Sequence, residues 1–214
     1  RGILYADDGD LESARQEFDR ALSLQEELAQ QHEEQLEFRH ELARTYKSRG
    51  SLLSRDREYD QALEAYARAL ELYDALLAET GKAGVSDRDF AFESAVCSLN
   101  RGNALSQKGV DASMDDDRRA ACAAARDEFA RAIAKLRALA DRYPGVPSYL
   151  DALANSYNDD GVVQSLQMAL ASADLLPTAE AYREIVSTWT NARHTYDDLI
   201  EIRPTVVSYR QRLA

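Results

Sequence analysis

Apolar residues along most of the chain fall three and four positions apart, a spacing that predicts amphipathic helices. Within this pattern, a glycine is followed at fixed distances by a small residue, an aromatic residue and another small residue. Counted from Gly50, these marks are Ala62, Tyr66 and Ala69, at offsets of 12, 16 and 19 residues. Residues at such spacings share a helix face. The pattern therefore predicts two antiparallel helices that pack through a small-residue notch.

The same marks recur along the chain, which indicates an internal repeat. From Gly2 they keep the same offsets, at Ala14, Phe18 and Ala21. From Gly102 they come 11 residues later, at Ala125, Phe129 and Ala132. From Gly161 they come 19 residues later, at Ala192, Tyr196 and Leu199. We expect that loops and helix ends lengthen in the later units while the packing contacts persist.

These marks divide the chain into four predicted helix pairs and the start of a fifth. The approximate bounds are 1–35, 36–84, 85–143, 144–203 and 204–214. We expect a first turn over Asp7–Asp10, a connection over His32–Gln35, a helix stop over Thr80–Gly84 with Gly81 as its cap, a turn over Lys108–Asp117 and a break over Tyr143–Pro147. Asp10 and Thr178 are expected to cap the helices that follow them, because short polar side chains accept hydrogen bonds from the first turn.

Both ends of the sequence fall inside predicted elements. The chain has no initiator Met, opens at Arg1-Gly2 within a first helix, and closes at Leu213-Ala214, where a fifth unit would begin. We therefore expect it to be a fragment of a longer protein.

Composition narrows the class of protein. The balance of residues, with nine Gly and four Pro among 214, is typical of an all-helical protein. A net charge of −12 argues against nucleic-acid binding, which depends on clustered Lys and Arg. No apolar stretch approaches the roughly 20 residues of a membrane helix, so we expect no membrane span. Cys97 and Cys122 lack the spacing of a metal or redox motif, and we expect buried thiols in a reducing, cytoplasmic compartment.

The sequence offers no arrangement of residues that indicates catalysis. Its three histidines, His32, His40 and His194, are too scattered for a metal cluster. Asp115–Asp117 lacks the ligand alternation of a calcium loop, and there is no phosphate-binding glycine loop or nucleophile elbow. We therefore expect a protein that is not an enzyme, with no cofactor and no metal.

The offsets of glycine, alanine, aromatic and alanine resemble those of the tetratricopeptide repeat. The resemblance covers essentially the whole chain and implies a right-handed superhelix of antiparallel helix pairs. The segment Pro144 to Tyr149, the pair Leu153-Ala154 and the stretch Asn155 to Gly161 resemble an extended form of this repeat. That form occurs in large bacterial proteins, often behind a serine/threonine protein kinase domain. The usual leucine before the glycine is absent, since Arg49 and Asp160 stand there in two of the units.

The resemblance also implies which residues line the concave groove of the superhelix, because certain positions around each glycine face it. A set of basic and amide side chains falls at these positions: Arg44, Lys47, Ser51, Arg55, Asn103, Gln107, Asn155 and Asn158. Lys and Arg pair with carboxylates, and Asn bonds both faces of an extended backbone. We expect this strip to bind a partner protein or peptide with acidic side chains or a C-terminal carboxylate.

The function expected from these features is a non-catalytic scaffold for protein–protein interaction. It would be a regulatory or substrate-docking segment of a larger bacterial protein that carries a kinase domain elsewhere. Two alternatives remain open at this stage. The strip is a solvated face with ordinary ion pairs, or the chain is a structural spacer that self-associates through exposed repeat edges.

Overall fold

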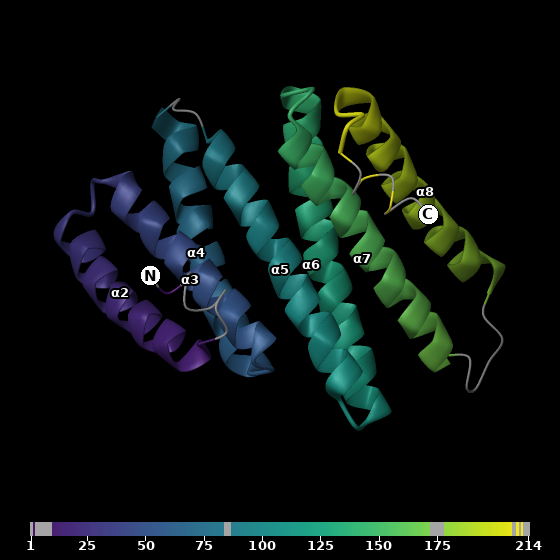
Figure 1. Cartoon of the computed structure of the whole chain (residues 1–214), viewed down its shortest axis with the longest axis horizontal. Helices are drawn as coiled ribbons and strands as arrows, with labels where there is room; N and C mark the ends of the chain where they lie inside the picture. Colours follow the sequence, from purple (N-terminus) through teal and green to yellow (C-terminus); the bar gives the residue numbers. More distant parts are fainter. Residues whose placement is uncertain are drawn as a thin grey trace. The chain divides into compact units, whose positions relative to one another are not determined.

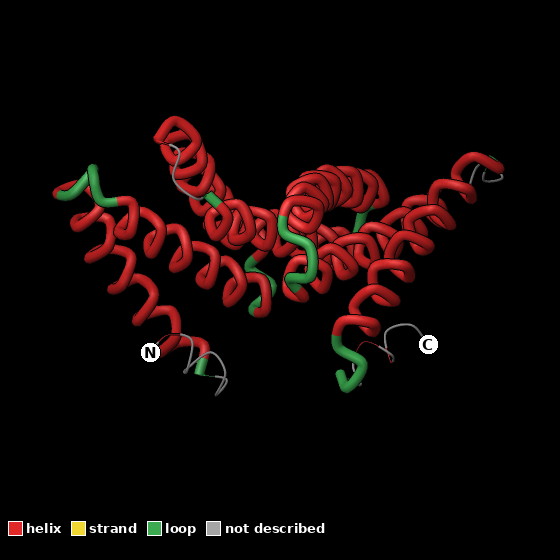
Figure 2. The backbone as a smooth tube through the Cα atoms, turned by 90° about the horizontal axis from the view of Figure 1, so that it is seen from above, coloured by secondary structure: helices red, strands yellow, loops and turns green. Residues whose placement is uncertain are grey.

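The computed structural model describes residues 2, 10–83, 87–171, 178–206, 209 and 211. This part of the chain is all-α, as predicted, and contains no strand (Figures 1 and 2). Its seven helices are α2 (Leu11–Gln31), α3 (Leu36–Arg55), α4 (Tyr59–Ala83), α5 (Arg88–Asp111), α6 (Asp115–Arg142), α7 (Pro147–Ala171) and α8 (Ala179–Ile202). None of these helices combines the length and the apolar character that crossing a membrane requires.

The helix starts follow local chemistry. The carboxylate of Asp10 accepts a hydrogen bond from the Ser13 amide at 3.1 Å and caps α2. The hydroxyl of Thr178 accepts one from the Ala181 amide at 3.2 Å and caps α8. Pro147 opens α7 as its first residue, where a missing N–H costs nothing. The two predicted caps are confirmed, as are the connection over His32–Gln35 and the predicted break, which ends where α7 begins at Pro147.

Two predicted boundaries need correction. The end of α4 at Ala83 falls within the stop expected over Thr80–Gly84, but Gly81 lies inside the helix and is not its cap. The turn expected over Lys108–Asp117 is shorter, because α5 extends to Asp111 and α6 already begins at Asp115. The three aspartates Asp115–Asp117 form the first turn of α6, where their charge is favourable beside the positive end of the helix dipole. The expected first turn over residues 7–9 and the fifth unit's Leu213-Ala214 lie outside the described residues.

The chain forms two compact units, residues 1–104 and 105–214. In the first unit, α3 packs against α2 and α4, and the beginning of α5 joins the core around Tyr66, Tyr73 and Cys97. In the second unit, α7 packs against α6 and α8. Arg15 and Arg126 each follow the first small residue of their repeat. Arg15 pairs with Asp56 and Glu58 in the first unit, and Arg126 pairs with Asp160 and Glu184 in the second.

Glycine notches join the paired helices of the first unit as predicted. A Cβ added to Gly2 would lie 3.2 Å from Cε2 of Phe18, and one added to Gly50 would lie 2.8 Å from Cδ1 of Tyr66. The aromatic ring therefore occupies the space that a side chain would need. Close approach of the helix backbone is the reason for glycine at these two positions.

The register predicted for the fourth pair is wrong. Gly161 packs against Trp189, whose Cε2 would lie 2.8 Å from an added Cβ, and not against Tyr196. Gly161 stands ten residues before the end of α7, and Trp189 stands ten residues after the start of α8. In a helical hairpin, residues that are equally far from the connection lie opposite each other. Gly161 and Trp189 are such a pair, so they pack against each other.

A second notch explains the error in register. Tyr196 is buried with Ala154, seven residues before Gly161, and lies seven residues after Trp189. The α3–α4 pair has the same arrangement, because Ala43 and Tyr73 are buried in one cluster, each seven residues from the Gly50 and Tyr66 notch. Seven residues are close to two helical turns, so successive notches share one face.

Candidate partner-binding surfaces

The predicted strip on α3 is largely engaged within the molecule. The ammonium group of Lys47 pairs with the Glu93 carboxylate of α5, and its side chain is only 17% exposed. The hydroxyl of Ser51 accepts a hydrogen bond from the Tyr66 hydroxyl at 3.1 Å. Arg44 pairs with Glu41 on its own helix at 2.8 Å. Arg44 and Arg55 present exposed side chains.

The amide residues of the strip divide between the two units. Asn103 lies on α5 in the first unit, whereas Gln107, Asn155 and Asn158 belong to the second. The side-chain Oδ1 of Asn155 accepts a hydrogen bond from the Tyr196 hydroxyl of α8 at 2.8 Å. The side-chain Nδ2 of Asn158 donates to the carboxylate of the neighbouring Asp159 at 3.3 Å. A continuous groove through all eight residues stays a prediction.

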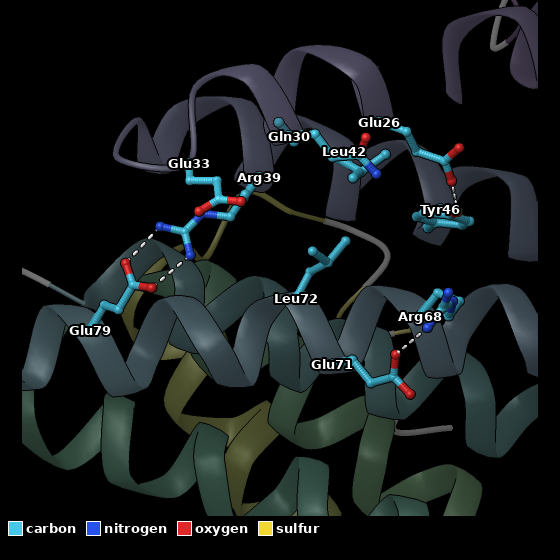
Figure 3. Close-up of a pocket in the computed structure, with 11 residues that line it drawn as sticks. Glu26, Gln30, Glu33, Arg39, Leu42, Tyr46, Arg68, Glu71, Leu72 and Glu79 are labelled. Carbon is cyan, nitrogen blue, oxygen red and sulfur yellow. Dashed lines mark hydrogen bonds and ion pairs between the residues drawn. The ribbon is translucent and has the colours of Figure 1, made fainter. Parts of the chain in front are cut away.

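A cleft that sequence reasoning missed lies in the first unit, above α3 and between α2 and α4. Its volume is about 570 Å³. Eleven residues from α2, α3, α4 and the α2–α3 connection line it: Glu26, Ala29, Gln30, Glu33, Arg39, Leu42, Tyr46, Arg68, Glu71, Leu72 and Glu79. Figure 3 shows Leu42 and Leu72 in the middle of the cleft, with charged side chains toward both ends.

The floor of this cleft is apolar because it is the exposed edge of a buried cluster. Leu22, Ala29 and Leu42 form that cluster, and Leu72 and Tyr46 pack against it while keeping part of their surface exposed. An apolar floor that water still reaches is a favourable place for another apolar side chain to bury surface.

The rim of the cleft consists of ordered charges. Arg39 donates two hydrogen bonds to the Glu79 carboxylate, both of 2.6 Å, in a bidentate pair that joins α3 to α4 (Figure 3). Arg68 pairs with Glu71 at 2.9 Å. Hydrogen bonding to Glu79 raises the pKa of Arg39, so this guanidinium stays charged. Glu33 lies beside Arg39 and keeps an exposed carboxylate.

Tyr46 marks the other end of the cleft. Its hydroxyl donates to the Glu26 carboxylate of α2. Burial, and then the hydrogen bond to Glu26, raises the pKa of Tyr46 to about 12. The phenol therefore remains a neutral donor at neutral pH and fixes the Glu26 carboxylate at the rim.

A neighbouring cleft of about 480 Å³ shares Glu26, Tyr46 and Arg68 with the first and extends toward Asp19 and Arg49. We call the two clefts together the α2–α4 groove. Six carboxylates and three arginines line it, so the groove is acidic. Its length of several helical turns, apolar floor and charged rim suit a helical or extended peptide segment.

The second unit contains a smaller cleft of about 220 Å³ beside Arg126, Gln164 and Glu184. Arg126 donates to Asp160 and to Glu184, and Gln164 donates to Asp160 at 2.8 Å. Burial raises the pKa of Asp160 and outweighs the opposing effect of Arg126. Every strong hydrogen-bonding group of this network meets a partner across α6, α7 and α8, which is typical of a structural link.

No group of metal-ligating side chains occurs among the described residues. The histidines are separated: His32 packs at a tilt against Phe38, His40 packs edge-on against Phe90 and Tyr73, and His194 is exposed. Cys97 and Cys122 are buried free thiols.

The sequence offered one signal for the α2–α4 groove that could have been used. Arg39 stands three residues before Leu42, and Arg68 stands four before Leu72, so a charge and an apolar residue share a face on each helix. What the sequence could not supply is the separation of α2 from α4, which depends on how both helices tilt against α3.

Comparison with protein-family models and with curated proteins gives no match to this chain.

Proposed function

We propose that this chain is a non-catalytic scaffold for protein–protein interaction, built as a tetratricopeptide-like array. The observation that carries the proposal is the α2–α4 groove, which combines an apolar floor with a rim of oriented carboxylates. We further propose that it serves as a docking segment of a larger bacterial protein, of the kind that carries a serine/threonine kinase domain. The repeat resemblance supports this second part.

The occupant proposed for the groove is a basic amphipathic segment of a partner protein. Its apolar side chains would bury against Leu42 and Leu72, and its Lys or Arg side chains would reach Glu33 and the other rim carboxylates. Complementary charge at a rim steers association and fixes register, while burial over the floor supplies most of the affinity. The α3 strip remains a second proposed contact, for acidic groups, through Arg44 and Arg55.

The test uses a labelled 18-residue probe peptide with leucines at helical spacing and lysines on both flanks. Fluorescence anisotropy should give saturable binding that weakens with added salt, since rim pairs are screened. Glu33→Lys should weaken binding about fivefold to tenfold by reversing a rim charge. Glu34→Lys is the matched control, because Glu34 is exposed and does not line the groove. Equal affinities for the two variants would refute the groove as the binding site.

A second candidate function, a self-associating spacer, is favoured by one observation. Three large apolar side chains on α8, those of Tyr182, Val186 and Trp189, are exposed. Sedimentation of the chain at several concentrations decides between a monomer and a self-associating module.

A further inference from the structure

A cleft in the second unit occupies the place that the α2–α4 groove occupies in the first. Its volume is about 340 Å³, and the end of α6, the α6–α7 connection, the start of α7 and the end of α8 line it. The α6–α7 connection and the C-terminal end of α8 lie at the same end of the second unit (Figure 1). Within the first unit, the α2–α3 connection and the end of α4 share one end in the same way. We call this site the α6–α8 cleft.

Residue positions show that the two sites are equivalent. Both α3 and α7 begin 14 residues before their notch glycine, which is Gly50 in α3 and Gly161 in α7. Ala29 and Ala140 each stand seven residues before the start of the next helix, and each lines its own site. The α6–α8 cleft is therefore a second copy of the same groove, formed between one helix and the next but one.

The two sites differ in the polarity of their closed end. Leu150 and Ile202 line the α6–α8 cleft at the positions that Arg39 and Glu79 hold in the α2–α4 groove. Leu150 packs on the buried cluster around Tyr196 while part of its surface stays exposed. Ile202 is 42% exposed. The cleft thus has an apolar floor that water still reaches, where another apolar side chain can bury surface.

The rim of the α6–α8 cleft is acidic. Asp141 of α6 and Asp198 and Glu201 of α8 line it with exposed side chains, and no described Lys or Arg lines it. None of these three carboxylates forms an ion pair with another described residue. Arg142 and Arg203 are exposed next to the rim in the sequence, but neither lines the cleft. The apolar floor and the carboxylate rim together favour a ligand that is both apolar and cationic.

The helix that follows a helix pair leaves this kind of groove open. In the first unit, no described residue of α5 lines the α2–α4 groove, because Phe90 of α5 packs on the cluster that contains Tyr73. Tyr209, which follows α8, packs on the cluster around Tyr196 and does not line the α6–α8 cleft. The opening of the cleft is therefore a property of the repeat itself, which leaves the site accessible to a partner.

We propose that the α6–α8 cleft binds a basic segment of a partner protein. One apolar side chain of the segment lies on Leu150 and Ile202, and a Lys or Arg on either side pairs with the rim carboxylates. The chain then offers a separate place for a basic segment in each of its two units. The ligand class is that of the proposed function, but the cleft lies in another unit and is tested by its own signals.

The test is a titration of the isotopically labelled whole chain with the 18-residue probe peptide, which has leucines at helical spacing and lysines on both flanks. Backbone amide NMR signals of Gly145, Leu150 and Ile202, which line the cleft, report on this site. They should move and saturate with a Kd at or below about 100 µM. Signals of Ala29 and Leu42 report on the α2–α4 groove in the same titration. Failure at one site is therefore distinguished from failure at the other.

Asp198→Lys should weaken binding at the cleft signals at least about fivefold, because it reverses a rim charge. Asp197→Lys is the matched control, since Asp197 is the neighbouring residue of α8, is also exposed, and does not line the cleft. Both substitutions place a lysine near the C-terminal end of α8, where the helix dipole favours it. Circular dichroism of both variants checks that the fold is kept.

Four results would overturn the proposal. The first is unmoved signals of Gly145, Leu150 and Ile202 with the probe at up to about 1 mM, a range that covers weak complexes. The second is an equal Kd for the Asp198→Lys and Asp197→Lys chains. The third is an equal response to a peptide in which glutamates replace the lysines. The fourth is a response to protein concentration without peptide, which would assign the cleft to a second copy of the chain.

Discussion

Individual aromatic side chains set the stability of this molecule at the points where paired helices meet. Tyr66 lies in the Gly50 notch, and its hydroxyl donates to Ser51 across the α3–α4 interface. Burial raises the pKa of Tyr66 to about 12, so the hydroxyl stays protonated and keeps its donor role. The ring fills the space beside Gly50 and is almost completely buried.

Tyr66→Ala should therefore lower the free energy of unfolding by about 3 to 5 kcal/mol, the cost of a large cavity in a core. Urea unfolding, followed by circular dichroism, measures this change in the free energy of unfolding. Tyr182→Ala is the control, since Tyr182 is exposed and its loss should change stability by less than about 0.5 kcal/mol. A similar small change for both variants would mean that the α3–α4 notch is not a core contact.

His40 gives the first unit a dependence on pH. Its ring packs edge-on against Phe90, with centroids 4.8 Å apart, and its Nε2 is buried without a hydrogen-bond partner among the described residues. Burial lowers the pKa of His40 and outweighs the opposing fields of Glu41, Glu93 and Asp89, while Arg44 acts in the same direction as burial. The folded state therefore keeps this imidazole neutral where the unfolded chain would protonate it.

Stability should fall as the pH drops below about 6.5, the pKa of an unfolded histidine, because only the unfolded state then binds the extra proton. The loss should be complete once the pH is below the lowered pKa of the folded state. Urea unfolding curves at pH 7.5 and 5.5 measure this loss of stability. The difference in the free energy of unfolding between the two pH values should be smaller for His40→Leu than for the parent chain. His194→Leu should keep the parent difference, and an effect that follows His194 would contradict the assignment.

At the scale of the elements, the helix pairs are joined by notches that recur every seven residues. Trp189 and Tyr196 both occupy such notches. Counting offsets from Gly161 alone matched this glycine to Tyr196, although it packs against Trp189. The choice depends on where the α7–α8 connection lies, and helix ends are weakly encoded in sequence. The marks themselves were correct, since Ala192, Tyr196 and Leu199 are all buried.

Gly161→Ala should test this register directly. The new methyl group would meet the Trp189 ring, so the variant should lose about 1 to 3 kcal/mol of stability and shift Trp189 emission. Gly145→Ala is a poor control because Gly145 has a φ of 82°, which strains any other residue. Ala169→Gly on the exposed face of α7 is better, and it should leave the emission unchanged. An unshifted emission in Gly161→Ala would restore the predicted pairing with Tyr196.

At the scale of the whole molecule, sequence patterns predicted the all-α class and the pairing of helices well. These features depend on periodicity and on small residues, both of which are local properties of the sequence. The binding surface was harder to predict, because the α2–α4 groove forms between two helices that are not consecutive in the sequence, with all of α3 between them. The predicted strip contains Lys47, whose charge is already paired with Glu93. Sequence alone could not show that this partner stands within the chain.

The central claim is that the α2–α4 groove binds a basic amphipathic segment. Backbone amide NMR of the isotopically labelled chain tests this binding residue by residue. The chain is titrated with the 18-residue probe peptide, which has leucines at helical spacing and lysines on both flanks. We predict that the largest shifts fall on α2, α3 and α4 around Ala29, Leu42 and Leu72, and that Glu33→Lys reduces them at equal peptide concentration. Shifts centred on Arg44, Lys47 and Arg55 of α3, with the groove residues unmoved, would contradict this proposal and return the site to the predicted strip.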